Sequence, residues 1–271
     1  FKDFSADISK AVDRSRNVSK KLTQGIDYLL KKNKIFLIKG SAILQSSTSV
    51  NVDDDIFSAK NIIIATGARP RSLPNLEIDK EIILSSREAL ELRNKPETLA
   101  IIGASAIGCE FAYYFNAYGT NVTLFEIMDR IVPKEDEEIS KELQRQFRKQ
   151  GINTNTATNI NKVTKSTKGI TLEFENSGGK KVSSFDKVLL GVGIKPNSDN
   201  LGLEPLGINI NENGFIEIDE YMRTNVNGVF AIGDVTGKLP LAHVAFDQGI
   251  IAAEFVAGKN PQGIDDYQQI P

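Results

Sequence analysis

The sequence has very few residues of the kinds that bind metals or form disulfides. Among its 271 residues there are one cysteine, Cys109, one histidine, His243, and no tryptophan. A single thiol excludes an internal disulfide framework and a cysteine-rich zinc or iron–sulfur site, and one histidine leaves little for a histidine-based metal site. We therefore expect no metal site, and we expect most of any chemistry to come from a bound cofactor.

Strong net charge and long apolar runs are also lacking. The formal charge at pH 7 is -2, from 33 basic and 35 acidic residues, so there is no electrostatic reason to expect nucleic acid or a membrane surface as a partner. No apolar stretch approaches the ~20 residues that span a bilayer, and the first residues do not resemble a signal peptide. The length fits two domains better than one, and the start at Phe1 rather than at methionine leads us to expect a fragment boundary there.

Apolar periodicity predicts the order of helices and strands. Residues 1 to about 32 are expected to form one long helix whose apolar side chains make a packing face. These side chains are Phe4, Ile8, Ala11, Val18, Leu22, Ile26 and Leu29. The uninterrupted apolar run at 62–65 predicts a strand buried on both faces, as in a parallel sheet. Other short apolar runs, which are strand candidates, lie at 35–38, 42–44, 188–191 and 229–232, and helical patterns lie at about 135–149 and 241–257.

The best-marked part of the sequence lies between 99 and 126. An apolar strand at 99–102 is followed by a turn at 103–108, a helix to about Tyr118 and a second strand at 122–125. Gly103 permits the tight turn, and Gly108 lets the helix pack close to the strand. The start of such a helix offers unpaired N–H groups and a positive dipole end to a pyrophosphate, so we predict a Rossmann-type nucleotide site.

Two positions indicate which nucleotide to expect. Glu126 ends the second strand at about the 20-residue spacing at which a carboxylate binds the adenosine ribose hydroxyls, so NAD is expected rather than NADP. Ser105 stands where the pattern has its middle glycine. Its Cβ is expected to crowd the pyrophosphate and weaken NAD binding, although its hydroxyl could donate a hydrogen bond. The alternative is a sheet turn that binds no nucleotide.

Two more residues lie in the first turn of this helix. Cys109 stands where a helix N-terminus could lower the pKa of a thiol, but its apolar neighbours and the lack of a second cysteine favour a buried packing residue. Glu110 could reach along the nicotinamide half of the cofactor or could simply favour the positive end of the helix. The sequence leaves both roles of Glu110 open.

Three segments, taken in order, resemble a known family. Residues 62–70 resemble the strand and turn that close the first segment of the FAD domain in two-dinucleotide flavoproteins, and residues 229–234 resemble the second FAD fingerprint. The NAD unit lies between them and closes at 191–197. This order is similar to that of the pyridine nucleotide–disulfide oxidoreductases, among which the dihydrolipoyl dehydrogenases are most similar over essentially the whole chain. The stretches that carry this likeness are 31–34 followed by Gly40, 106–112, 200–204 and 241–245.

The resemblance implies an α/β fold with two Rossmann-like dinucleotide-binding domains, the NAD domain being inserted into a partial FAD domain. The implied domains are an N-terminally truncated FAD segment at 1–95, an NAD domain at 96–222, and a second FAD segment with the start of an interface domain at 223–271. The implied FAD contacts are Gly40, Thr66, Gly67, Ala68, Asp234, Pro240, Leu241, Ala242 and His243. The implied NAD contacts are Gly103, Ala104, Ser105, Ala106, Ile107, Gly108, Glu110, Glu126 and Gly193. Without the resemblance, Gly233 and Asp234 have a plainer interpretation as turn formers.

The resemblance also implies a reaction. Dihydrolipoyl dehydrogenases reoxidise dihydrolipoamide through a redox disulfide, FAD and NAD. Their redox cysteine pair and their C-terminal acid–base pair have no counterpart in this sequence, so we expect no catalytic residue here, poor FAD affinity and no activity of the chain alone. His243 is expected to serve the structure of the flavin site. The implied partners of the intact protein are a second subunit and the lipoyl domains of 2-oxoacid dehydrogenase or glycine cleavage complexes, in the cytoplasm or alternatively in the mitochondrial matrix.

Two other functions stay open at this point. One is a related FAD- and NAD(P)H-dependent reductase whose acceptor is glutathione, mercuric ion, peroxide or ferredoxin. The other is a noncatalytic module that binds a nucleotide or a partner.

Overall fold

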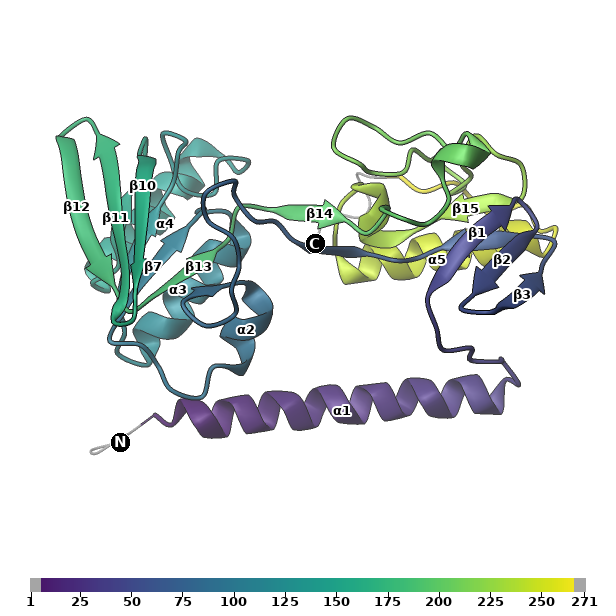
Figure 1. Ribbon diagram of the computed structural model, residues 1–271, viewed down its shortest axis with the longest axis horizontal. Coiled ribbons are helices and arrows are strands. Elements are labelled where there is room, and N and C mark those ends of the chain that lie inside the picture. Colours follow the sequence, from purple (N-terminus) through teal and green to yellow (C-terminus); the bar gives the residue numbers. More distant parts are fainter. Residues whose placement is uncertain (1–5, 266–271) are drawn as a thin grey trace. The chain divides into compact units, whose positions relative to one another are not determined.

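The computed structural model describes residues 6–265 (Figure 1), and the chain divides into two units. One unit comprises 1–29 and 70–193, and the other comprises 30–69 and 194–271. The chain passes between them through β5 (Ala68–Pro70) and β14 (Ile194–Pro196), which pair with each other. β6 (Ile83–Leu84) pairs with β13 (Lys187–Leu190) and joins the segment after residue 70 to the first unit. The domain boundaries expected from the sequence, at 1–95, 96–222 and 223–271, stay a prediction. The assignment of the two domains to NAD and FAD stays a prediction.

The first unit is built on a five-stranded parallel sheet. Its strand order is β6, β13, β7 (Thr98–Ile102), β8 (Asn121–Phe125) and β9 (Asn153–Asn155). Leu99 and Ile101 of β7 pack into one apolar cluster, and Ala100 and Ile102 pack into another. Such alternation buries the strand on both faces, as an all-parallel sheet requires.

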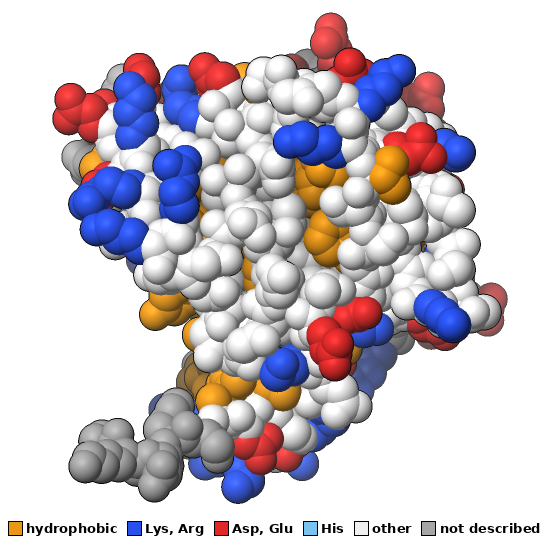
Figure 2. Space-filling view, turned by 90° about the vertical axis from the view of Figure 1, so that its left-hand side faces the viewer, with side chains coloured by type: hydrophobic (Ala, Val, Ile, Leu, Met, Phe, Trp, Pro, Cys, Tyr) orange, Lys and Arg blue, Asp and Glu red, His pale blue; other side chains and the backbone are white. Residues whose placement is uncertain are grey.

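Helices cover one face of this sheet, and an antiparallel sheet covers the other. The first cluster includes Phe115 of α3 (Ala106–Ala117) and Phe147 of α4 (Glu137–Lys149). The second includes Leu172 and Phe174 of the antiparallel sheet formed by β10 (Asn159–Ser166), β11 (Gly169–Asn176) and β12 (Gly179–Phe185). Figure 2 faces the side on which β12 lies in Figure 1, and both basic and acidic side chains appear on that surface.

Two helices of this unit begin with side-chain caps. The Asp136 carboxylate accepts a hydrogen bond from the Glu138 N–H at 2.8 Å at the start of α4. The short helix α2 (Ser86–Glu91), which was not expected from the sequence, begins with a capping box between Ser85 and Glu88. Such caps satisfy backbone N–H groups that have no partner inside the helix.

The second unit has a two-stranded parallel sheet and an antiparallel meander. β4 (Ile62–Ile64) pairs with β15 (Val229–Ala231) in parallel. The meander consists of β1 (Ala42–Ser46), β2 (Ser49–Val52) and β3 (Asp55–Ser58). Further elements are the 3₁₀ turns η1 (Glu204–Leu206) and η2 (Gly233–Thr236) and the helix α5 (Ala242–Val256).

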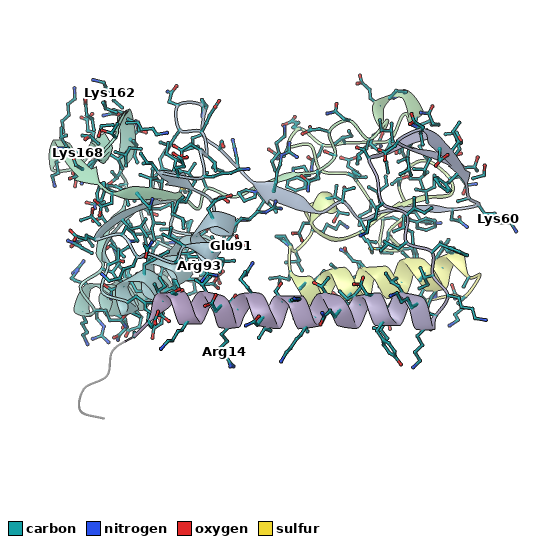
Figure 3. All side chains as sticks on the ribbon, turned by 60° about the horizontal axis from the view of Figure 1, so that its bottom comes forward. Arg14, Lys60, Glu91, Arg93, Lys162 and Lys168 are labelled. Carbon is teal, nitrogen blue, oxygen red and sulfur yellow. The ribbon has the colours of Figure 1, made fainter. Side chains whose placement is uncertain are left out.

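The long N-terminal helix α1 (Ile8–Lys32) confirms the predicted helix but not its predicted packing face. Ile8 is buried, whereas Val18, Leu22, Ile26 and Leu29 are between 47% and 67% exposed. Among the described residues, the buried side chains of α1 come only from its first turns, and Phe4 lies outside the described residues. Arg16 pairs with Glu91 at 3.0 Å and Arg93 pairs with Asp13 at 2.7 Å, so polar contacts tie α1 to the region of α2. Glu91 and Arg93 are labelled beside α1 in Figure 3.

Two further strand predictions need correction. The run at 62–65 forms β4 in a parallel pair, as predicted, but Ile63 is 39% exposed and the strand is not buried on both faces. Residues 35–38 form no strand, and Phe36 is 93% exposed. Within residues 6–265 no strand pairs with residues 35–38, so this apolar run has no neighbour to form a sheet with. In the same range no helix combines the length and apolar character that crossing a bilayer requires.

Candidate functional site

The turn after β7 brings three backbone segments into close contact. Gly103 has φ +97°, which L side chains rarely adopt, and a Cβ there would lie 2.5 Å from the Gly191 carbonyl oxygen. A Cβ on Gly108 would lie far inside van der Waals contact with the Gly103 carbonyl oxygen. Glycine is therefore required at both positions, which confirms that α3 starts against the end of β7 as predicted.

Ser105 stands at the N-cap of α3 without straining the backbone. Its φ of -76° and ψ of -172° are extended values that any L residue adopts. Among the described residues its side chain caps no N–H group of the helix, and its Oγ instead donates to the Gly191 carbonyl oxygen at 3.3 Å. The first N–H groups of an α-helix have no intrahelical partner, so the start of α3 can bind an anion.

Glu126 is attached to this turn by hydrogen bonds. It directly follows β8 and is 8% exposed. Its Oε2 accepts from the Ala104 N–H at 2.7 Å, and its Oε1 accepts from the Met128 N–H at 3.0 Å. The carboxylate lies at the end of the second strand, as predicted, and it also supports the glycine turn. The spacing in the sequence did not reveal its contact with the Ala104 N–H.

Cys109 is a packing residue, as predicted. It is 6% exposed, and its Sγ lies 3.4 Å from the Ala104 carbonyl oxygen. Burial, with the charges of Glu126 and Glu110 adding to it, raises the pKa of the thiol to about 12. Glu110 itself is exposed, just past the first turn of α3, and either of its two predicted roles remains a proposal.

The remaining predicted NAD residue, Gly193, follows β13. It has φ +102°, and no described heavy atom lies within 4 Å of a Cβ built there. The glycine is thus favoured by its backbone conformation rather than by crowding. Its role in NAD binding stays a prediction.

In the second unit, Thr66 and Gly67 form a turn that is held by residues near β14. The Thr66 Oγ1 donates to the Asn197 carbonyl oxygen at 2.7 Å, and the Asn197 Nδ2 donates back to the Thr66 carbonyl oxygen at 2.9 Å. The Arg69 guanidinium donates to the Asn197 Oδ1 at 2.8 Å and pairs with Asp199. Arg69 and then Lys195 lower the pKa of the Asp199 carboxyl. Asn197 and Asp199 are residues that the predicted site lacked, although the turn at Pro196 and Asn197 was visible in the sequence.

Asp234 is the second residue of the 3₁₀ turn η2, which follows β15. Gly233 has φ +72°, and the Thr236 Oγ1 donates to its carbonyl oxygen at 2.8 Å. The Ile232 N–H donates to the Ile64 carbonyl oxygen at 3.0 Å, so β4 and β15 end side by side. Thr66 and Asp234 therefore follow the carboxyl ends of two neighbouring parallel strands, the edge at which α/β folds bind ligands.

The other predicted FAD residues lie at the start of α5 and before the meander. Pro240 and Leu241 precede α5, and Ala242 and His243 are exposed in its first turn. Gly40 lies against the β2–β3 turn, where a Cβ would lie 2.5 Å from an Asp53 carboxylate oxygen. A side chain at position 40 would displace the side chains of Asp53 and Val52, so packing favours glycine there, and the contact of Gly40 with FAD stays a prediction.

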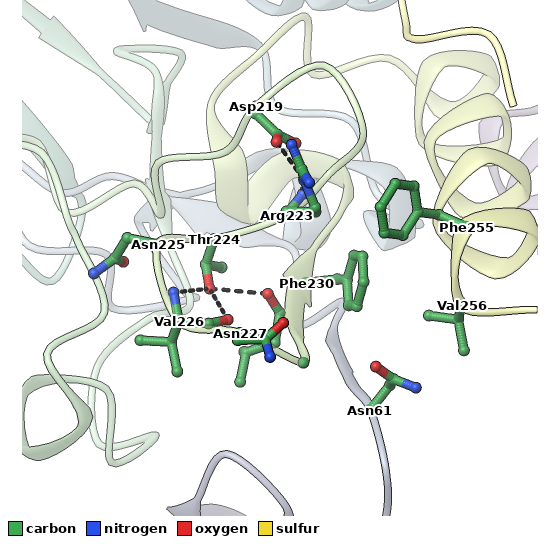
Figure 4. A pocket seen from close by; sticks show the side chains of 12 residues that line it. Asn61, Asp219, Arg223, Thr224, Asn225, Val226, Asn227, Phe230, Phe255 and Val256 are labelled. Carbon is green, nitrogen blue, oxygen red and sulfur yellow. Dashed lines mark hydrogen bonds and ion pairs between the residues drawn. The ribbon is translucent and has the colours of Figure 1, made fainter. Parts of the chain in front are cut away.

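One cavity of about 540 Å³ lies at the opposite end of β4 and β15 (Figure 4). Asn61 and Gly228, which directly precede the two strands, line it, and no predicted cofactor residue does. Arg223 lines it as well; its guanidinium bonds to Asp219 and lies 5.2 Å from the centre of the Phe255 ring. The cavity is therefore distinct from the strand ends that carry Thr66 and Asp234. No group of three metal-ligating side chains occurs among residues 6–265.

A family model described as pyridine nucleotide-disulphide oxidoreductase matches residues 2–249. A dihydrolipoyl dehydrogenase of Mycobacterium leprae is 38% identical to this chain, and the aligned region covers 99% of this chain and 59% of the relative. The dihydrolipoyl dehydrogenase of Corynebacterium glutamicum is 40% identical, covering 95% and 56% respectively. The chain thus spans less than two thirds of the length of these relatives.

Solved structures agree with this result. The crystal structure of LpdA from Mycobacterium tuberculosis has a TM-score of 0.88 at 27% identity, covering 97% of this chain and 59% of that one. The HOCl-induced flavoprotein disulfide reductase RclA of Escherichia coli has a TM-score of 0.87 at 26% identity, covering 95% and 59%. These likenesses confirm the predicted fold class.

Proposed function

Because the chain belongs to the pyridine nucleotide-disulphide oxidoreductases, we propose that it is the nucleotide-docking part of a flavoprotein of the dihydrolipoyl dehydrogenase type. In this proposal NAD binds the first unit and FAD binds the second. The observation that carries it is the turn from Gly103 to Gly108, which opens α3 and is held by the carboxylate of Glu126.

The residues of the first unit suit NAD. The first N–H groups of α3 would hold the pyrophosphate, and the positive end of the helix dipole favours its charge. Glu126 would accept hydrogen bonds from the adenosine ribose hydroxyls and would repel the 2′-phosphate of NADP. The N–H groups of Ala104 and Met128 already occupy two acceptor positions of the carboxylate. A carboxylate has about four such positions, so two remain for the ribose hydroxyls.

The residues of the second unit suit part of an FAD site. Thr66, Gly67 and Ala68 would line one strand end, and Asp234 would accept hydrogen bonds from the ribityl chain at the other. Gln248 bonds to Gly233, and its buried Nε2 has no partner among the described residues, so a bound ligand or an ordered water would satisfy this donor. When bound, FAD supplies the two-electron transfer between a thiol pair and NAD.

The chain's own share in this chemistry is binding and selection. Cys109 is its only thiol, and it is buried with a raised pKa, so thiol–disulfide exchange needs cysteines that this sequence does not contain. Oxidation of dihydrolipoamide, docking of lipoyl domains and pairing with a second subunit are thus assigned to the whole protein. The chain alone is expected to show no turnover of dihydrolipoamide, and measurable turnover would contradict this assignment.

Nucleotide titration tests the proposal directly. We expect the purified chain to bind NADH more tightly than NADPH by about tenfold, which corresponds to about 1.4 kcal/mol. Isothermal titration calorimetry measures both affinities on the same preparation. Equal affinities would contradict the role of Glu126, and lack of binding of either nucleotide would contradict the NAD site as a whole.

A second candidate is a related flavin reductase with another acceptor, favoured by the likeness to RclA. The two candidates differ in the acceptor and not in nucleotide docking. Turnover of the protein encoded by the full reading frame around this sequence separates them. NADH oxidation with lipoamide supports the first, and NADH oxidation only with a different acceptor supports the second.

A further inference from the structure

Gln248 joins α5 to the turn that carries Asp234. Its side chain is completely buried, at 0% exposure, in the middle of the helix. Its Oε1 accepts a hydrogen bond from the Gly233 N–H at 2.6 Å. A helix residue therefore holds the peptide group between Ile232 and Gly233, one residue before Asp234.

The geometry of the turn depends on this peptide. Gly233 has φ +72°, so its backbone lies in the left-handed region, and a Cβ there would lie 3.5 Å from the Ala245 Cβ of α5. Its N–H is held by Gln248, and its carbonyl oxygen is held by the Thr236 Oγ1 at 2.8 Å. The peptide groups on both sides of Gly233 are thus held, including the one that leads into Asp234.

The other end of the Gln248 amide is unusual for a residue that only packs. Its Nε2 is buried and has no hydrogen-bond partner among the described residues. A buried donor without an acceptor is destabilising. Leucine or methionine would fill a similar volume in the helix without burying an unpaired donor. An amide at this position thus fits a role in the site better than a role in the core.

We propose that Gln248 is a positioning residue for the flavin turn, acting through the Gly233 N–H to aim Asp234 at the ribityl chain. This role rests on the proposed function, since FAD is the ligand in question. Gln248 itself touches no reacting group in this proposal. Its effect is on how well the turn is preorganised.

Two substitutions separate positioning from packing. Gln248→Met keeps the approximate volume and removes the acceptor, whereas Gln248→Glu keeps a carboxyl oxygen that can accept from Gly233. A matched control is Gln144→Met in α4 of the other unit, which removes a side-chain bond to Thr154 that is 3.0 Å long. If Gln248→Met does not fold, Gln248→Asn, which withdraws the amide by one methylene, replaces it with the same expectations.

The first measurement needs no cofactor. In Gln248→Met, hydrogen–deuterium exchange at the Gly233 amide should be at least about tenfold faster than in the unmodified chain. A tenfold change corresponds to a loss of about 1.4 kcal/mol in the free energy that protects this amide. Exchange should stay near the original rate in Gln248→Glu and in Gln144→Met. Unchanged exchange in Gln248→Met would overturn the proposed link between α5 and the turn.

The second measurement is FAD affinity, followed by quenching of flavin fluorescence with FAD up to about 1 mM. Gln248→Met should bind FAD about tenfold more weakly than the unmodified chain, Gln248→Glu should recover most of the loss, and NADH affinity should stay the same in both. FAD binding that is unaffected by Gln248→Met refutes the positioning role alone. Failure of the unmodified chain to bind FAD refutes the flavin part of the proposed function together with this role.

Discussion

The Glu126 carboxylate accepts a hydrogen bond from the Ala104 N–H at 2.7 Å, so the residue after β8 holds the glycine turn after β7. Glu126 is also the residue predicted to face the adenosine ribose. If this role is correct, one buried carboxylate both supports the turn, as observed, and selects the nucleotide, as proposed. A substitution at this position is expected to change both.

Exchange of the charge at Glu126 should change the preference for NADH over NADPH. In Glu126→Arg the cation would attract the 2′-phosphate that the carboxylate repels, so the preference should shrink by at least about tenfold or reverse. Glu126→Gln removes the charge but keeps an oxygen that can accept from the Ala104 N–H. This variant should therefore lose the preference for NADH with less damage to the turn than Glu126→Arg. Calorimetric titration of both nucleotides measures the ratio. Glu138→Arg, at an exposed position in α4, is the matched control, and an equal effect there would contradict a local role of Glu126.

Replacement of Ser105 by glycine should strengthen NAD binding. The Ser105 backbone is unstrained, so its effect on binding is expected from the Cβ beside the pyrophosphate rather than from conformation. Ser105→Gly should bind NADH several-fold more tightly, which is about 1 kcal/mol. Ser105→Ala keeps the Cβ and removes the hydroxyl bond to Gly191, so it should bind no better than the original. Equal gains in both variants would show that the hydroxyl, and not the Cβ, weakens binding.

The Rossmann unit could be predicted closely because its signals are local. The apolar runs predict β7 and β8 within a residue of their observed ends. The two glycines predict that a helix follows, although α3 begins at Ala106, inside the turn predicted at 103–108. The packing face of α1 and the full burial of β4 could not be predicted. Periodicity shows which side chains share a face, but whether the chain covers that face depends on tertiary contacts.

The candidate site shows the same limit. Spacing along the chain predicts Glu126, because it follows a recognisable strand, whereas only the resemblance to the family predicts Asp234. The bonds from Ala104 to Glu126, from Thr66 to Asn197 and from Gly233 to Gln248 join segments that are distant in sequence. No local pattern marks Asn197 or Gln248 as a partner, since their roles arise only when β4, β15 and α5 are brought together.

Gly108 should be the glycine of the first unit least tolerant of alanine. A Cβ there would meet the Gly103 carbonyl oxygen, a backbone atom that cannot move without opening the turn. Gly108→Ala is expected to lower the free energy of unfolding by about 1–3 kcal/mol and to abolish NADH binding. Gly25→Ala is the matched control, because no described heavy atom lies within 4 Å of a Cβ there and alanine favours a helix by about 1 kcal/mol. Denaturant unfolding measures both variants, and a neutral Gly108→Ala would contradict the close packing of the turn.

Asp79 should make the stability of the first unit depend on pH under acid conditions. Its Oδ1 accepts from the N–H groups of Glu81, Ile82 and Ile83, and its Oδ2 pairs with the Lys165 ammonium. Partial burial opposes its ionisation, but Lys165 and the backbone N–H groups outweigh this and lower the pKa of the carboxyl from 3.8 to about 2. A lowered folded-state pKa means that the carboxylate stabilises the fold above pH 3.8 and that this contribution is lost as the pH falls toward 2.

Asp79→Asn tests this dependence, since the amide oxygen can still accept from the backbone while the charge opposite Lys165 is lost. Because the pair is partly exposed, the expected loss at pH 7 is about 1 kcal/mol at most. The difference in free energy of unfolding between the original chain and Asp79→Asn should shrink steadily below pH 4 and should also shrink in high salt. Asp54→Asn, at an exposed aspartate in the β2–β3 turn, is the matched control. A difference that stays constant from pH 7 to pH 2 would show that Asp79 acts through its backbone hydrogen bonds alone.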